Sequence, residues 1–374
     1  MAFSSYKSLT LAESQSGTAD STDWPLAIAL DGNVQAADVD LKTVGNGGYV
    51  QNANGYDIRP YADSALTTPL AYQLVYYQAT TGKLEMHVKI PTLSTSVDTV
   101  IYLAFGDAAL NTDGSSNTTW NSGYVGVWHL ADGTTLSGDD STSNANNGTV
   151  TTPTAATGQI DGGGNFVAAS SDRINITNHA SLRPAGAHAI SGWIKTAGSA
   201  GVMFSSYDQT VAAVYGLSMG VAVTGAHPNQ ISIVVGPGTV GSQFNEVYGN
   251  VTTVNDNNWH HVFYESDGVS GYNVFVDGVS QSATDFNGTG GFVNPVYFLG
   301  NTVNIGREDL PSYTPPITGK YWNGQMDEIR FSNAFRGQSW ATADYNSQKA
   351  SSTFITWGAR IPVASDPHWV MTFV

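Results

Sequence analysis

The sequence predicts an all-β protein of two tandem β domains, and three observations support this prediction. The 374 residues include 41 glycines, and the turns between strands need residues that tolerate positive φ. Short apolar runs recur along the chain and end at turn-forming pairs such as Asn-Gly and Asp-Gly. Few segments carry Leu, Glu and Lys at helical spacing. A chain of this length is expected to form two or three domains, each with its own core.

Residues 1–112 are predicted to form the first β domain. Asp31-Gly32 predicts a hairpin-type turn, and Thr81-Gly82 is expected to join two strands. The run 84–90 alternates apolar and polar residues, so we expect one buried face. The run 100–106 is apolar throughout and is predicted to be a central strand. In chain order, the predicted strands are residues 24–30, 70–77, 84–90 and 100–106.

Residues 113–120 are polar and rich in Gly, Ser and Asn, which predicts a linker. Residues 121–349 are predicted to form the second domain, because short strands separated by regular turn signals indicate a β-sandwich. Gly162-Gly163-Gly164 is expected to be a turn between strands, since no phosphate-binding Lys or helix follows it. The internal strands predicted for this domain are residues 173–176, 189–195, 230–235, 259–265 and 272–278.

The end of the chain carries two further predictions. One helix is expected over Trp340–Asn346, with Ser339 as its N-cap. Residues 350–374 form a tail of high apolar content. This content predicts that the tail docks, either on the chain's own domains or on a partner.

Two segments of the second domain resemble the opening and closing signature of a concanavalin A-like (laminin G-like) jelly roll. Residues 123–150 combine an apolar strand, a loop rich in Asp, Asn, Ser and Gly, and a second strand. Residues 324–333 read Gly-Gln-Met-Asp-Glu-Ile-Arg-Phe-Ser-Asn. Three segments in the same order extend the resemblance: residues 191–195, 259–262 and 303–307. The resemblance implies a jelly-roll sandwich that most often holds a sugar or a protein surface.

Residues 5–110 are similar to a domain of unknown function that often precedes such jelly rolls in bacterial and phage surface proteins. The similarity implies assembly or anchoring rather than an activity, and it rests on residues 57–61, 87–93 and 101–107.

The jelly-roll resemblance also implies one structural calcium ion. In similar domains the Asp of the Asp-Glu-Ile-Arg segment meets the Asp- and Asn-rich loop around the ion, which here gives Asp140, Asn144 and Asp327 as ligands. Carboxylate and amide oxygens in flexible loops suit calcium. The alternative is that these side chains cap turns.

No catalytic residues are predicted. Asp327-Glu328 is the nearest approach to a glycosidase carboxylate pair, but adjacent residues of a strand point to opposite faces. The same argument disfavours zinc at His260 and His261, and the chain has no cysteine. We therefore expect a protein that is not an enzyme.

Sugar binding needs an aromatic face and a few polar groups, and the sequence does not choose among several aromatics in polar stretches. The polar loop Gly306–Lys320, with three prolines, is a plausible recognition loop. The aromatic candidates are Tyr207, Tyr215, Phe244, Tyr248, Tyr313 and Tyr321.

The formal charge of −16, with only 14 Lys and Arg, leaves no basic stripe, so neither nucleic acid nor anionic membrane is an expected partner. No apolar run is long enough to span a bilayer, and the start lacks a signal-peptide pattern. We therefore expect synthesis in a host cytoplasm without a signal peptide.

The sequence favours a non-enzymatic bacteriophage virion surface protein, either a capsid decoration protein or a tail or fibre component. Its jelly roll would bind carbohydrate or a host surface, its partners would be other virion proteins and a cell-surface glycan, and we expect a homo-oligomer. The alternatives are a secreted bacterial adhesin or polysaccharide-binding protein, a laminarinase-type glycoside hydrolase, and a cement protein without a ligand.

Overall fold

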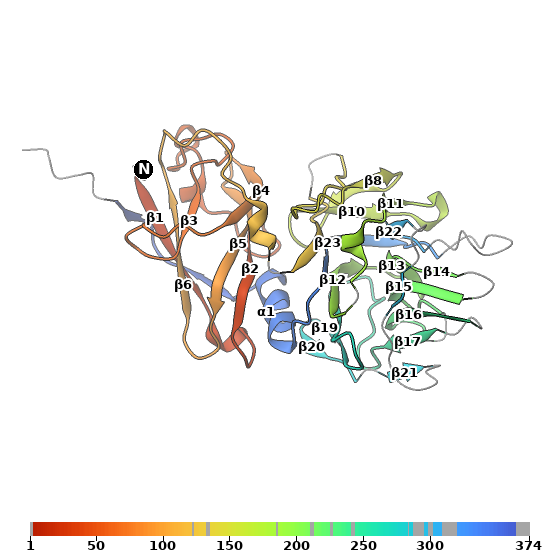
Figure 1. The fold of residues 1–374 in the computed structure, drawn as a ribbon. Helices are drawn as coiled ribbons and strands as arrows, with labels where there is room; N and C mark the ends of the chain where they lie inside the picture. Colours follow the sequence, from red (N-terminus) through yellow and green to blue (C-terminus); the bar gives the residue numbers. More distant parts are fainter. Residues whose placement is uncertain are drawn as a thin grey trace, which may run out of the picture. The chain divides into compact units, whose positions relative to one another are not determined.

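The computed structural model of the chain consists of two compact units. The first contains Met1–Thr119 and Asn346–Val374, and the second contains Trp120–Tyr345. Strands dominate both (Figure 1), so the predicted all-β fold class is confirmed. The structure describes residues 3–121, 123–131, 135–184, 186–209, 213–224, 227–240, 244–282, 284–286, 295–297, 302–308 and 320–363.

The first unit contains two antiparallel sheets. The five-stranded sheet has the order β24-β1-β6-β3, with β25 also paired to β1, and the three-stranded sheet has the order β2-β5-β4. Both strands from the C-terminal segment, β24 and β25, thus pair with β1, the first strand of the chain. The bounds are β1 Ser5–Leu11, β2 Ser21–Leu30, β3 Arg59–Tyr61, β4 Tyr72–Gln78, β5 Lys83–Leu93, β6 Thr99–Phe105, β24 Ile355–Trp357 and β25 Ile361–Pro362.

The four strands predicted for this unit are confirmed as β2, β4, β5 and β6, and β6 has neighbours on both sides, as its apolar sequence predicts. The hairpin at Asp31-Gly32 was a wrong prediction, because β2 pairs with β5. Asp31 Oδ1 instead accepts the N–H groups of Asn33 and Val34, at 2.6 and 2.9 Å. β5 also buries two of its polar residues, Glu85 and His87.

The second unit contains two larger antiparallel sheets. The order of the eight-stranded sheet is β20-β19-β18-β12-β23-β10-β9, with β7 paired to β23. Its strands are β7 Tyr124–Trp128, β9 Thr154–Thr157, β10 Gly162–Phe166, β12 His188–Lys195, β18 Trp259–Ser266, β19 Tyr272–Val276, β20 Val279–Ser280 and β23 Gly324–Ser332.

The nine-stranded sheet of the second unit has the order β21-β17-β16-β15-β13-β22-β11-β8, with β14 paired to β15. Its strands are β8 Gly148–Thr151, β11 Arg173–Ile176, β13 Gly201–Ser205, β14 Asp208–Gln209, β15 Ala213–Val221, β16 Ile231–Val240, β17 Asn245–Tyr248, β21 Thr284–Phe286 and β22 Val303–Ile305.

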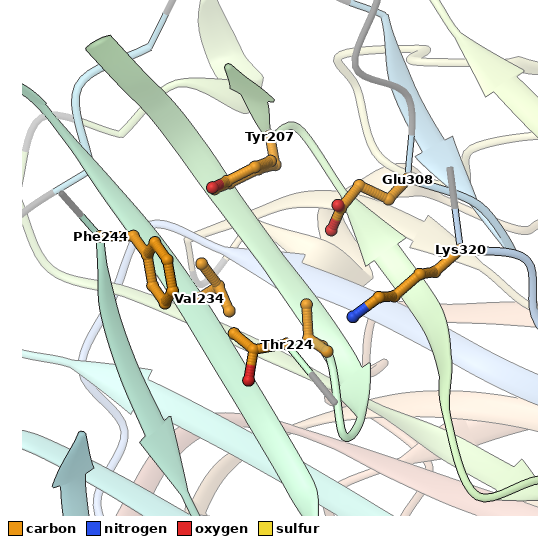
Figure 2. Close-up of a pocket in the computed structure, with 7 residues that line it drawn as sticks. Tyr207, Thr224, Val234, Phe244, Glu308 and Lys320 are labelled. Carbon is orange, nitrogen blue, oxygen red and sulfur yellow. The ribbon is translucent and has the colours of Figure 1, made fainter. Parts of the chain in front are cut away.

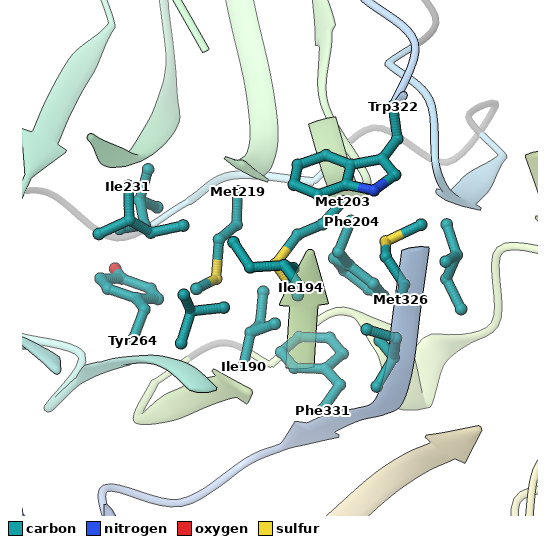
Figure 3. Close-up of a cluster of buried hydrophobic side chains, with 14 of the residues drawn as sticks. Ile190, Ile194, Met203, Phe204, Met219, Ile231, Tyr264, Trp322, Met326 and Phe331 are labelled. Carbon is teal, nitrogen blue, oxygen red and sulfur yellow. The ribbon is translucent and has the colours of Figure 1, made fainter. Parts of the chain in front are cut away.

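The core of the second unit draws side chains from both sheets (Figure 3). Ile190 and Phe331 come from the eight-stranded sheet, and Met203 and Met219 come from the nine-stranded sheet. Each fully buried side chain of this size contributes about 1.5–3 kcal/mol. Two sheets that share one apolar layer form a sandwich, as predicted.

The described residues contain one α-helix, α1 (Gln338–Gln348), which confirms the predicted helix. Ser339 is not its N-cap, because the helix begins one residue earlier. The loop before the helix is held instead by Glu265 Oε2, which accepts the N–H groups of Arg336 and Gly337 at 2.7 and 2.8 Å. The short 3₁₀ helices are Glu13–Gln15, Val39–Leu41, Val44–Asn46, Asn117–Trp120, Ala168–Ser170 and Ala180–Leu182.

The Gly162-Gly163-Gly164 run is a strand, β10, rather than the predicted turn. Glycine is needed there because a Cβ on Gly163 would lie 2.9 Å from the Gly158 Cα and 3.0 Å from the Met326 carbonyl oxygen. Among the described residues, no helix is long and apolar enough to cross a membrane.

Candidate functional site

The outer face of the nine-stranded sheet carries a row of polar side chains. Successive strands place Asn175, Asn304, Ser205, Ser218 and, beyond Val234, Glu246 side by side. Their chain neighbours point into the core, and alternate residues of a strand face opposite ways. The face turned away from the core is therefore polar along most of this row.

Around Val234, which lies between Ser218 and Glu246 in this row, the outer face is apolar. Val202, Tyr207, Val223 and Val234 form a buried cluster separate from the main core, and the partly buried Phe244 packs against it. A satellite cluster on the outside of a sheet provides an apolar floor for a ligand.

A cavity of about 210 Å³ opens over this floor (Figure 2). Figure 2 shows Phe244 on one side of the cavity and the Glu308 and Lys320 side chains on the other. Strand β16 supplies Val234, and the segments that follow β13 and β15 or precede β17 supply most of the rest. The full lining is Tyr207, Val223, Thr224, Val234, Phe244, Glu308 and Lys320.

The two charged residues are set side by side by backbone pairing. The Glu308 N–H donates to the Lys320 carbonyl at 3.1 Å, and Arg307 bridges to Tyr321 in antiparallel fashion. Directly opposed residues of an antiparallel pair have Cβ atoms about 5 Å apart and project to the same side. The Arg307 guanidinium also lies 5.1 Å from the centre of the Tyr321 ring.

Gly306 starts this paired arm, and the sequence needs glycine there for two reasons. Its φ is +88°, and a Cβ would lie 2.6 Å from the Phe166 ring. The Trp322 N–H donates to the Gly306 carbonyl at 2.8 Å, which closes the pairing.

The electrostatics of the pocket centre on Lys320. Burial lowers its pKa, and the attraction of Glu308 and Glu246 only partly opposes that effect. Glu246 is fully buried, and its Oε2 accepts the Thr224 hydroxyl at 2.6 Å. Because that hydroxyl proton is used, Thr224 can offer only acceptor lone pairs to a ligand.

Two of the aromatic candidates from the sequence, Tyr207 and Phe244, line the pocket. Tyr248 stacks on His227 instead, with ring centroids 3.5 Å apart, and Tyr321 lies under Arg307. Tyr215 stands opposite Asp208 in the sheet. Tyr313 and the middle of the predicted recognition loop lie outside the described residues, but both ends of that loop, Glu308 and Lys320, line the pocket.

Sequence reasoning missed Val223, Thr224 and Val234. Residues of this apolar or small type also occur in the core. Only the register of the strands shows which of them lie on the outer face of the sheet and which face the core.

The residues predicted to hold calcium differ in their contacts. Asp140 Oδ1 accepts the N–H groups of Val127 and Thr142, each at 2.9 Å, and Oδ2 accepts the Thr142 hydroxyl and the Asn146 N–H. The Asn144 amide donates to the Val125 carbonyl at 3.4 Å. These are the contacts of turn-capping residues.

Asp327 differs from the two loop residues. It is fully buried, its Oδ2 accepts the Ile160 N–H at 2.8 Å, and its Oδ1 has no hydrogen-bond partner in the part of the chain that the structure describes. Burial, and then the neighbouring Glu328, raise its pKa well above the usual range. Calcium at these three residues stays a prediction, and Asp327 alone presents an oxygen that an ion would satisfy.

The rest of the Asp-Glu-Ile-Arg segment builds a buried charge network. Arg330 Nη2 and Nε donate to Glu328 Oε2 at 2.6 and 3.1 Å, and Nη1 donates to Asp344 of helix α1 at 2.8 Å. Burial alone would raise the pKa of Asp344, but Arg330 and His261 outweigh it and lower that pKa. These charges are thus satisfied inside the unit.

Buried Glu and His side chains, residue types that occur as metal ligands, also lie close together in each unit. In the second unit, His129 Nδ1 lies 2.5 Å from Glu328 Oε1. In the first unit, His87 Nε2 lies 3.3 Å from Glu85 Oε1.

Comparison with known proteins supports the jelly-roll assignment for part of the chain. Residues 168–341 match a family model, Laminin_G_3, described as the concanavalin A-like lectin/glucanases superfamily. The sequence resemblance to such domains is thereby confirmed over this range. No curated protein matches the chain.

Several solved structures are similar to the chain at low identity. Domain 4 of AbnA, a GH43 extracellular arabinanase from Geobacillus stearothermophilus in complex with arabinotriose, is 16% identical with a TM-score of 0.43, over 60% of this chain and 98% of that one. The binding domain of Paraclostridial Mosquitocidal Protein 1 is 10% identical with a TM-score of 0.42, over 60% and 52%. The botulinum neurotoxin serotype C1 binding domain is 11% identical with a TM-score of 0.41, over 61% and 53%. The chain thus spans about half the length of the two toxin structures.

Proposed function

We propose that the protein is a non-enzymatic glycan-binding component of a bacteriophage particle surface, and that its second unit binds sugar in the pocket of Figure 2. One observation carries the glycan-binding part of the proposal. The pocket combines two aromatic rings, from Tyr207 and Phe244, with an ammonium and a carboxylate that lie across the cavity from Phe244.

This combination suits a sugar better than other ligands of its size. A pyranose or furanose ring has an apolar C–H face, which packs on aromatic or aliphatic side chains, and an edge of hydroxyls, which hydrogen-bond to polar groups. Phe244 and Val234 supply the first kind of surface, and Glu308, Lys320 and Thr224 supply the second.

The same geometry supports binding without hydrolysis. Retaining and inverting glycosidases need two carboxyl groups flanking the scissile bond. Glu246 is fully buried and bonded to Thr224, so Glu308 is the one carboxylate among the described residues that line the cavity. Asp327 and Glu328 are also buried, and Glu328 contacts His129 and Arg330. Assays with chromogenic glycosides should therefore show no turnover.

The virion location rests on the whole chain. It is acidic, free of cysteine and rich in strands, as surface components of phage particles often are, and its two units resemble a tandem found in phage and bacterial surface proteins. We propose a capsid decoration protein or a tail or fibre component that oligomerises on the particle and contacts other virion proteins. Immunogold labelling of purified particles tests this, and label on bacterial cells but not on particles would favour an adhesin instead.

Glycan binding is tested by a glycan array probed with the full chain. We expect binding to a defined set of glycans, and we expect Phe244→Ala to weaken it at least about tenfold by removing the stacking face. Phe335→Ala is the matched control, because Phe335 is an exposed phenylalanine outside the pocket, and it should leave binding unchanged. Equal loss in both variants, or no glycan bound at all, would contradict the proposal.

A further inference from the structure

We infer that the pocket selects a single neutral sugar residue, recognised through two adjacent hydroxyls by Lys320 and Glu308, and rejects acidic sugars. This inference rests on the proposed glycan binding and deepens it. The argument proceeds from size, then from the arrangement of donors and acceptors, then from charge.

The size of the cavity sets the length of the bound segment. Pockets for drug-sized ligands measure about 300–1,000 Å³. The cavity here measures about 210 Å³, which is below that range. It accommodates one sugar ring, so the site is suited to one residue, such as a chain end, rather than to several residues in a row.

The two charged side chains form a matched donor and acceptor. Backbone pairing places Glu308 and Lys320 opposite each other, and Figure 2 shows the Lys320 ammonium pointing toward the middle of the pocket with the Glu308 carboxylate beside it. A sugar hydroxyl can accept from the ammonium while its neighbour donates to the carboxylate. Hydrogen bonds to ionised groups are stronger than those between neutral groups, so this vicinal pair orients the ring.

The charge around the cavity decides against an acidic sugar. Among the described residues, Glu308 lines the cavity with Lys320, and Glu246 lies behind the lining residue Thr224, whose hydroxyl it accepts at 2.6 Å, so two carboxylates surround one ammonium. A bound carboxylate would be attracted by one group and repelled by two. The overall charge of −16 adds to that repulsion during approach. A neutral sugar meets no such penalty.

The test uses matched sugars that differ in one group. Methyl galactoside and methyl glucoside are compared with the corresponding methyl uronides, in which the C6 alcohol is a carboxylate, by isothermal titration of the full chain. We expect at least one neutral glycoside to bind about tenfold or more tightly than its uronide, the factor that corresponds to losing one hydrogen bond to a charged group. This comparison needs no variant and therefore does not depend on folding of a mutant.

Two charge variants then locate the selectivity. Lys320→Met should weaken the neutral glycoside about tenfold without improving the uronide. Glu308→Gln keeps the shape of the side chain and removes one negative charge that repels the uronide. It should reduce the ratio of the affinities for the neutral glycoside and the uronide about tenfold. Lys83→Met and Glu13→Gln in the first unit make the same charge changes away from the pocket and should alter neither affinity.

The two hypotheses fail in different ways. Tighter binding of the uronide, or charge variants that behave like their controls while Phe244→Ala still abolishes binding, would overturn the inference and leave glycan binding intact. Absence of binding to every sugar here and to every glycan on the array would overturn the proposed function itself.

Discussion

Two clusters of charged side chains in the second unit use the same residue types for different ends. Around Arg330, the guanidinium contacts Glu328 of its own strand and Asp344 of helix α1, and all three residues are almost completely buried. Around Lys320, the charged groups line an open cavity beside aromatic rings. The comparison teaches that a charged cluster is a candidate binding site when it faces space that a ligand can enter.

The largest loss of stability is expected in the buried cluster around Arg330. Arg330→Met should destabilise the second unit by about 3–5 kcal/mol, because it leaves Glu328 and Asp344 buried without their partner. Urea unfolding measures this. Arg183→Met is the control, since Arg183 donates to the His179 carbonyl at the surface, and a cost of more than about 0.5 kcal/mol there would be unexpected. A small effect at Arg330 would mean that this network is not structural.

Gly306→Ala should have the next largest effect. The substitution combines a positive φ with a Cβ 2.6 Å from the Phe166 ring, so we expect about 1–3 kcal/mol of destabilisation together with weaker sugar binding. Gly186→Ala meets no atom within 4 Å and should be nearly neutral. If Gly306→Ala were tolerated as well as Gly186→Ala, the paired arm would not position Glu308 and Lys320.

A smaller effect is expected at His260, outside both clusters. Hydrogen bonding to Asp277 raises its pKa, and burial opposes the shift without cancelling it. A raised pKa in the folded state means that the added stability is complete below about pH 6.5, the unfolded value, and is lost as the pH rises through the folded value.

We therefore expect His260→Gln to cost more stability at pH 5.5 than at pH 8.5. His188 titrates in the opposite sense, since burial lowers its pKa, so the comparison is made between variant and wild type at each pH. A cost that does not change with pH would contradict the ion pairs of His260 with Asp256 and Asp277.

The smallest effect concerns calcium. If Asp327, Asp140 and Asn144 hold an ion, millimolar calcium should raise the melting temperature of the second unit and Asp327→Asn should abolish that rise. Differential scanning calorimetry with and without a chelator measures it. No change with calcium would leave Asp140 and Asn144 as turn caps, the role that their hydrogen bonds already fit.

Local sequence signals predicted much of the fold. Apolar runs ending at turn residues predicted strands such as β12, β18 and β19, and the family match confirms the jelly-roll assignment for residues 168–341. The prediction of a turn at the glycine run of β10 failed because the close packing of Gly163 against Met326 involves a strand that is distant in the sequence. The burial of Glu85 and His87 was also not predicted, because an alternating pattern does not show whether another part of the protein covers the polar face of a strand.

The candidate site was predictable only in part. Tyr207 and Phe244 were two of the six aromatic candidates in polar stretches, and Glu308 and Lys320 belong to the predicted recognition loop. Their convergence was not predictable, because it depends on the register of β13, β15, β16 and β17 and on the bridge between Arg307 and Tyr321. A shift of one residue in the register of any of these strands would turn its outward-facing side chains toward the core.

The most direct test of the account is a crystal structure of the full chain soaked with the sugar that binds best in the array. We predict one sugar ring over Val234 and against Phe244, with adjacent hydroxyls on the Lys320 ammonium and the Glu308 carboxylate. Sugar bound elsewhere on the second unit, with this pocket occupied by water alone, would contradict the account.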